Sequence, residues 1–205
     1  MNSNLLRLTL LLAAIILTGC TASQPRNVND ICAIFQEKDD WYGDAADARE
    51  KWGSPIPVMM AIMHQESRFE AKAKPPRRKI FGFIPGTRPS SAYGYSQAKK
   101  STWREYTQSA GRYSADRDDF ADAIDFVGWY NQKSHQRNGI SLTDTYGLYL
   151  AYHEGHGGYK RGTYRKKQWL IDVARKVQRR ANSYQQQLGG CEEELEDDGW
   201  FFGWF

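Results

Sequence analysis

The chain has 205 residues, of which 40% are hydrophobic and 25% are charged, and its formal net charge is +4. This length accommodates one domain with a hydrophobic core and excludes two domains of ordinary size. The charge is uneven, because residues 21–190 contain 27 Lys and Arg against 18 Asp and Glu, whereas residues 192–198 contain six acidic residues and no basic one. The basic body predicts an anionic partner.

The N-terminus has the pattern of an export signal, with Arg7 before the apolar run of residues 8–17. Leu17-Thr-Gly-Cys20 resembles the lipobox of bacterial lipoproteins. That resemblance implies removal of residues 1–19 as a signal peptide and lipidation of Cys20; the alternative is an ordinary secretory signal with a chance cysteine. In such lipoproteins an aspartate after the cysteine favours the inner membrane, and here Thr21 follows. We therefore expect an outer-membrane lipoprotein that faces the periplasm and binds no nucleic acid.

The export signal also sets expectations for the cysteines and the domain boundaries. We expect residues 20–29 to form a polar tether and residues 30–191 to form the domain. Once Cys20 is lipidated, Cys32 and Cys191 are the two cysteines left in an oxidising compartment. A disulfide between them would join the two ends of the domain, and the alternative is a pair of free thiols.

The hydrophobic pattern predicts a mainly α fold with no large sheet. Apolar residues recur at three- and four-residue intervals, as in core-facing helices. The predicted helices begin near Asp30 and then cover residues 44–52, 58–69, 101–110, 120–136, 143–152 and 165–188. Pro55 and Pro57 are expected to break the chain before the third helix. Residues 72–91 are basic and rich in proline, which predicts a long loop with or without a hairpin. This loop either flanks a cleft or is a solvated excursion.

Glu66 is an unusual charge within the predicted helix 58–69. Met59, Ile62 and Met63 precede it by seven, four and three residues, so they share its helix face. A carboxyl placed on an apolar face keeps its proton to higher pH and can act as a general acid. The alternative is a helix-end carboxylate paired with Arg68 or a nearby lysine.

Three motifs occur in order along the chain: Glu66-Ser67 after an apolar helix, Gly94-Tyr-Ser-Gln97 before a Ser-Thr-Trp helix, and Ala151-Tyr-His-Glu-Gly155. Together they resemble the catalytic domain of the soluble lytic transglycosylases, which is similar to goose-type lysozyme. The resemblance covers roughly residues 55–185. It implies a single lysozyme-like domain that cleaves the β-1,4 bond between N-acetylmuramic acid and N-acetylglucosamine in peptidoglycan.

The resemblance also implies a mechanism without a metal or organic cofactor, in which one glutamate transfers both protons. Glu66 would protonate the glycosidic oxygen and then deprotonate the muramyl 6-hydroxyl, which closes to a 1,6-anhydro end. The implied supporting roles are positioning of Glu66 by Ser67 and Tyr152 and sugar contacts through Gln97 and the backbone of Gly94, Tyr95 and Ser96. The partners expected on this reading are peptidoglycan glycan strands and, through the lipid, a membrane.

Two departures from the family pattern leave alternatives open. Tyr95 and Ser96 stand where the family commonly has leucine and methionine, and His153 stands where it has asparagine. The chain between Glu66 and Gln97 is also longer than usual. Glu154 could act as a base for water, which would make the protein a hydrolytic muramidase, or it could be a solvated or structural carboxylate. The third alternative is a peptidoglycan-binding lipoprotein without turnover.

Two further features of the sequence are a motif similar to a zinc site and the C-terminal tail. His153-Glu-Gly-His156 is one residue shorter than the His-Glu-x-x-His zinc motif, and Gly155 argues against a helix there, so we expect no metal. Residues 192–205 form an acidic tail that ends in Trp and Phe residues. This tail could dock on the domain, meet a membrane surface or bind a protein partner, or it could be a loose end.

Overall fold

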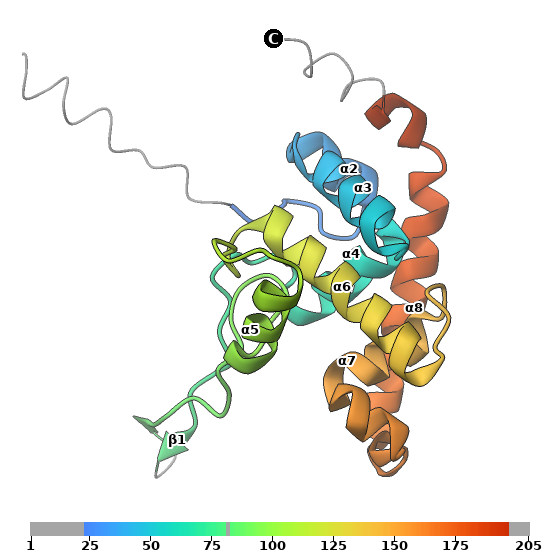
Figure 1. Ribbon diagram of the computed structural model, residues 1–205. Helices are drawn as coiled ribbons and strands as arrows, with labels where there is room; N and C mark the ends of the chain where they lie inside the picture. Colours follow the sequence, from blue (N-terminus) through green and yellow to red (C-terminus); the bar gives the residue numbers. More distant parts are fainter. Residues whose placement is uncertain (1–22, 81–82, 197–205) are drawn as a thin grey trace, which may run out of the picture.

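The computed structural model describes residues 23–80 and 83–196, and its fold is mainly α (Figure 1), as the sequence predicts. The helices are α2 (Ile31–Glu37), α3 (Trp41–Trp52), α4 (Ile56–Ser67), α5 (Lys100–Ser109), α6 (Phe120–Asn138), α7 (Thr145–Lys160), the short 3-10 helix η1 (Thr163–Lys166) and α8 (Gln168–Leu188). The strands β1 (Lys79–Ile80) and β2 (Ile84–Pro85) form a small antiparallel ribbon.

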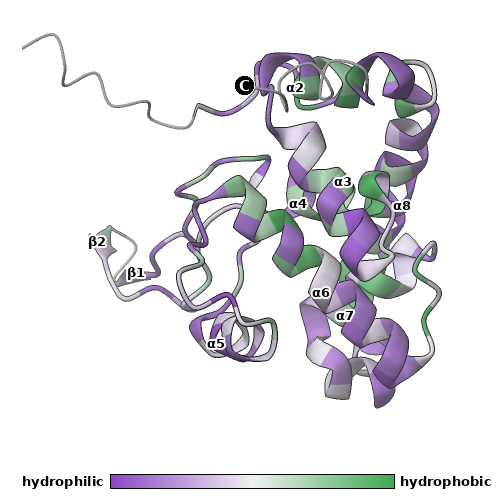
Figure 2. Ribbon diagram, turned by 45° about the horizontal axis from the view of Figure 1, so that its top comes forward, coloured by the Kyte–Doolittle hydropathy of each residue, from purple (hydrophilic) through white to green (hydrophobic). Residues whose placement is uncertain are grey.

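Helix α4 lies at the centre of the helical body, in contact with α3, α6 and α8 (Figure 1). All of its residues from Ile56 to His64 are buried. The helix begins two residues earlier than predicted, with Pro57 inside its first turn. The first turn tolerates proline because its N–H groups need no partner within the helix. Apolar side chains on every face are typical of a fully enclosed helix, and Figure 2 shows hydrophobic residues gathered on this central part.

Helix α7 extends further than the sequence suggests. The predicted end is residue 152, but the helix continues to Lys160 across a break at Gly155. Gly155 has φ 74° and ψ 156°, which is non-helical, so its effect on the local backbone was predicted correctly. The helix resumes after this residue, which the sequence pattern did not reveal.

The long basic loop contains the hairpin, which projects from the helical body beside α5 (Figure 1). The N–H of Arg78 donates to the carbonyl of Thr87 at 3.1 Å, and the N–H of Gly86 donates to the carbonyl of Arg78 at 2.7 Å. Lys79 faces Pro85 across the hairpin. We call residues 72–91, which include this hairpin, the basic ribbon.

The two ends of the described chain meet at α2. Cys32 and Cys191 form the expected disulfide, across 159 residues of sequence. Residues 192–196 are helical, and Glu192 pairs with Arg49 of α3 at 2.6 Å. The acidic tail therefore begins packed on the domain.

The export signal, Cys20 and the aromatic end of the tail lie outside the described residues, so those predictions stay predictions. Within residues 23–80 and 83–196, no helix has the length and apolar character that crossing a membrane requires.

Candidate active site

Glu66 lies in the last turn of α4, just before an unusual change of chain direction. Arg68 and Phe69 follow with φ values of 53° and 64°, the left-handed region that residues other than glycine rarely adopt. The Ser67 hydroxyl donates to the carbonyl of Met63 at 3.4 Å and accepts from the N–H of Phe69 at 3.1 Å. Both bonds go to the main chain, so Ser67 fixes the turn that carries Glu66.

The Glu66 side chain lies next to Tyr149 of α7. Glu66 is half-buried, and burial raises the pKa of its carboxyl to about 7, an effect that the nearby Tyr149 hydroxyl opposes. Tyr149 is itself buried on α7. This environment produces the carboxyl that the apolar neighbours of Glu66 predicted, one that binds and releases a proton near neutral pH.

Tyr149 is the functional residue that the sequence reasoning missed. Tyr152 was expected to hold Glu66, but its hydroxyl donates to the carbonyl of Ser96 at 2.7 Å. Tyr152 still lies close enough to Glu66 for the negative carboxylate to raise the tyrosine pKa, after the larger effect of burial. Tyr149 precedes Tyr152 by three residues and so shares its helix face, which is the signal that could have identified it.

The segment Gly94–Gln97 is fixed by main-chain contacts. Gly94 has φ 78°, and a Cβ at this position would lie 1.9 Å from the carbonyl oxygen of Arg117, so only glycine fits. The amide nitrogen of Gln97 donates to the carbonyls of Ala73 at 3.0 Å and Gly94 at 2.9 Å. These two bonds occupy the amide nitrogen of Gln97, so its amide oxygen is the atom left for a contact with a sugar.

Tyr95 and Ser96 have side chains in the core. Tyr95 is 1% exposed and packs edge-on against Trp41 and Phe120, with ring centroids 5.6 and 5.8 Å apart. Ser96 is fully buried. Their expected contribution to the site is therefore restricted to the main chain, and the Ser96 carbonyl already receives the Tyr152 hydroxyl.

Glu154 is held in a set of polar contacts on its own side of α7. The Lys167 ammonium lies 2.6 Å from its carboxylate, His153 lies 3.1 Å away, and the Thr163 hydroxyl also donates to it. Burial alone would raise the pKa of Glu154, but the bonds to Lys167, Thr163 and His153 lower it to about 2. A carboxylate with these partners fits the structural interpretation better than the role of a base for water.

The four histidines have separate surroundings. His153 is exposed and contacts Glu154 and Trp169, whereas His156 stacks on Tyr130 at 4.4 Å and lies 3.0 Å from the Ser134 hydroxyl. His64 is buried in α4, and His135 bonds to the carbonyl of Ile140. In the described part of the chain, no three His, Cys, Asp or Glu side chains are grouped as metal ligands.

Comparison with known proteins gives one family match. The family described as "Transglycosylase SLT domain" matches residues 8–191. No curated protein and no solved structure shows significant similarity to the chain. The family match spans helices α2 to α8 and the residues of the candidate site, and it agrees with the mainly α, lysozyme-like fold expected from the three motifs. The chain belongs to the transglycosylase SLT domain family.

Proposed function

We propose that this protein is a peptidoglycan lytic transglycosylase that cleaves the bond between N-acetylmuramic acid and N-acetylglucosamine and leaves a 1,6-anhydro end. The observation that carries the proposal is the Glu66 carboxyl, placed at the end of a buried helix with a pKa of about 7. Near neutral pH such a group is present in both protonation states. It therefore suits a reaction in which the same residue must first give and then take a proton.

The two steps balance without water. Protonated Glu66 gives its proton to the glycosidic oxygen as the bond from that oxygen to the anomeric carbon breaks. The resulting carboxylate takes the proton of the muramyl 6-hydroxyl while that oxygen bonds to the anomeric carbon. Glu66 is protonated again at the end, and the reaction uses no metal or organic cofactor.

The surroundings of Glu66 support the lytic reaction over hydrolysis. Enzymes that use water ordinarily need a second carboxylate as base or nucleophile. Glu154, the candidate for that role, is ion-paired with Lys167 and bonded to Thr163. The Tyr149 hydroxyl, by contrast, is placed to stabilise the ionised form of Glu66 between the two steps.

Replacing Glu154 by glutamine tests this choice. We expect Glu154→Gln to cleave purified sacculi within about twofold of the wild-type rate, because the replaced group takes no part in proton transfer. The proportion of anhydro ends among the released muropeptides, measured by mass spectrometry, should also stay the same. A large loss of rate together with a loss of reducing ends would identify Glu154 as the base for water and the protein as a muramidase.

Replacing Tyr149 by phenylalanine tests how the site sets the pKa of Glu66. The hydroxyl lowers this pKa, so its removal should raise it and shift the alkaline limb of the pH profile of kcat/KM to higher pH. We also expect turnover to fall about tenfold, as is common when one charge-assisted hydrogen bond is lost. Tyr159→Phe, on the same helix but stacked on Tyr164, is the matched control. An unchanged pH profile in Tyr149→Phe would contradict the assignment.

We further propose that the enzyme acts from the periplasmic face of the outer membrane, anchored by a lipid on Cys20. The support is the Leu-Thr-Gly-Cys20 pattern with Thr21 after it. An anchor of this kind would keep the basic domain close to its anionic polymer.

A further inference from the structure

The basic ribbon carries a concentrated positive charge. Residues 72–91 contain six basic residues and no acidic one. These residues are exposed, and no ion pair found among the described residues includes any of them. They are Lys72, Lys74, Arg77, Arg78, Lys79 and Arg88. Like charges held on one short ribbon repel one another, so the arrangement favours an anionic partner.

The base of the ribbon is attached directly to the candidate active site. The carbonyl of Ala73 accepts from the Gly94 N–H and from the Gln97 amide nitrogen, both at 3.0 Å. The same segment is bonded through Ser96 to Tyr152, which lies beside Glu66. The base of the ribbon is therefore linked through the Gly94–Gln97 segment to the surroundings of Glu66.

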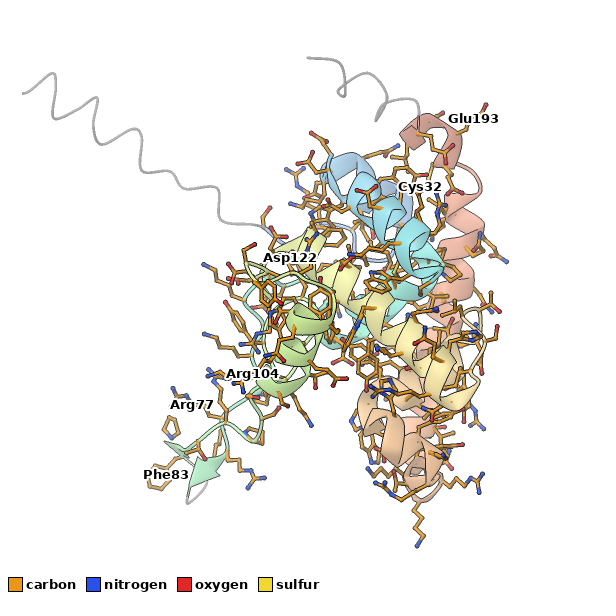
Figure 3. The ribbon with its side chains drawn as sticks, viewed as in Figure 1. Cys32, Arg77, Phe83, Arg104, Asp122 and Glu193 are labelled. Carbon is orange, nitrogen blue, oxygen red and sulfur yellow. A yellow bond between two sulfur atoms is a disulfide. The ribbon has the colours of Figure 1, made fainter. Side chains whose placement is uncertain are left out.

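The far end of the ribbon extends away from the helical body. Figure 3 shows Arg77 and Phe83 at this end, with Phe83 pointing outward, and Phe83 is 76% exposed. An extended chain advances about 3.3 Å per residue, so Lys79 can stand about 20 Å from Ala73. The cations are thus spread from the site outward, in a direction that leaves the helices.

We propose that the basic ribbon binds the carboxylates of the stem peptides carried by the glycan strand at Glu66. This inference rests on the proposed function and specifies its substrate as peptide-bearing strands. The sugars of a peptide-bearing strand are uncharged, because their amino groups are acetylated and each lactyl carboxyl is held in the amide bond to a peptide. The peptides, in contrast, carry several carboxylates and extend sideways from the glycan. A ribbon that starts at the site and extends outward with exposed cations matches that geometry and charge.

A membrane surface is the competing partner, since cations around an exposed aromatic residue also bind anionic lipid. Phe83 on the ribbon is such an exposed aromatic residue. The bonds from Ala73 to Gly94 and Gln97 favour the substrate, because they tie the ribbon to the site rather than to a separate face.

The test compares intact sacculi with the glycan strands that an amidase frees from their peptides, called stripped sacculi below. Amide cleavage leaves one lactyl carboxylate on each muramyl residue of these strands, so the comparison isolates the carboxylates of the peptides. Binding is measured in full-length protein carrying Glu66→Gln, so that nothing is cleaved, and cleavage is measured with Glu66 present. The ribbon variant is Arg77→Gln/Arg78→Gln/Lys79→Gln. The matched control, Lys166→Gln/Lys176→Gln/Arg179→Gln, removes three exposed positive charges elsewhere.

We expect the parent protein and the control to bind intact sacculi about tenfold more tightly than stripped sacculi, with a preference that weakens at high salt. The ribbon variant should lose this preference while it binds stripped sacculi as before. Equal binding to both substrates by the parent protein would overturn the inference. So would a ribbon variant that keeps the preference but loses binding to phosphatidylglycerol vesicles, which would assign the ribbon to a membrane.

The cleavage measurements distinguish a failure of the proposed function from a failure of the inference about the ribbon. If protein with Glu66 cleaves neither substrate, the transglycosylase proposal fails, and the binding ratio in the Glu66→Gln protein still decides what the ribbon recognises. If both substrates are cleaved at equal rates by parent and ribbon variant alike, the transglycosylase proposal stands and the ribbon inference fails.

Discussion

Glu66→Gln should lower turnover on sacculi by about 10²- to 10⁴-fold, the range that positioned acid and base groups contribute. Glutamine has nearly the shape of glutamic acid but carries no transferable proton. Because Glu66 is proposed to act in both steps, no other residue of the site takes over its role. Glycan affinity should remain, which would be measured as binding to sacculi by sedimentation.

The same substitution has a predictable effect on stability. The carboxyl has a pKa of about 7 in the folded protein and an ordinary value of 4.5. A carboxyl whose pKa is higher in the folded protein than in the unfolded protein stabilises the folded state at low pH. This stabilisation is lost as the pH rises from 4.5 through 7. The loss amounts to about 3 kcal/mol in the wild type, and Glu66→Gln should not show it. Urea unfolding of the wild type and of Glu66→Gln, each at about pH 4.5 and about pH 8, measures the two dependences of stability on pH.

Glu70→Gln is a matched control for both effects, since Glu70 is an exposed glutamate four residues further along. It should keep full activity and the wild-type dependence of stability on pH. Turnover by Glu66→Gln within a few-fold of the wild type would contradict the catalytic assignment, whatever its stability.

The second large effect is expected from loss of the disulfide. Cys32→Ser/Cys191→Ser should lower the free energy of unfolding by about 3 kcal/mol, within a loop-entropy limit of about 5 kcal/mol for a closed segment of this length. The disulfide restricts the conformations of the unfolded chain, because it joins α2 to the segment after α8. The Ile31 N–H, which donates to the Gln187 side chain at 3.0 Å, should keep the ends together in the folded variant.

Activity should change little in the same variant at temperatures where it is folded. Cys32 lies at the end of the molecule away from α7, the helix that carries Tyr149 (Figures 1 and 3). Urea unfolding of the oxidised wild type, the reduced wild type and the double variant gives the comparison. Equal midpoints in all three would show that the disulfide does not stabilise this domain.

The helices and the raised pKa of the Glu66 carboxyl could be predicted from the sequence, because both depend on local spacing. The apolar neighbours of Glu66 lie within two turns of the same helix, and Asp30, a predicted start, caps α2 through its side chain. The start of α4 was missed by two residues, since proline was read as a break although the first turn of a helix accepts it.

The partners of the site residues could not be predicted in the same way. Ser96 and Lys167 meet their partners through packing between α7, η1 and the loop before α5, and no local pattern encodes those contacts. The spacing of Tyr149 and Tyr152 places both on one face of α7 but does not say which of them contacts Glu66. The position of the Tyr95 side chain in the core could not be read from its motif either, whereas its predicted role at the site involves its main chain.

In the proposed reaction, Glu66 deprotonates the muramyl 6-hydroxyl, and this oxygen, rather than water, bonds to the anomeric carbon. Sacculi incubated with the protein in water enriched in heavy oxygen, followed by mass spectrometry of the new muramyl ends, test it directly. We predict ends that are lighter by one water than reducing ends, that contain no heavy oxygen, and that are absent with Glu66→Gln. New reducing ends that carry heavy oxygen would contradict the account and identify the protein as a hydrolase.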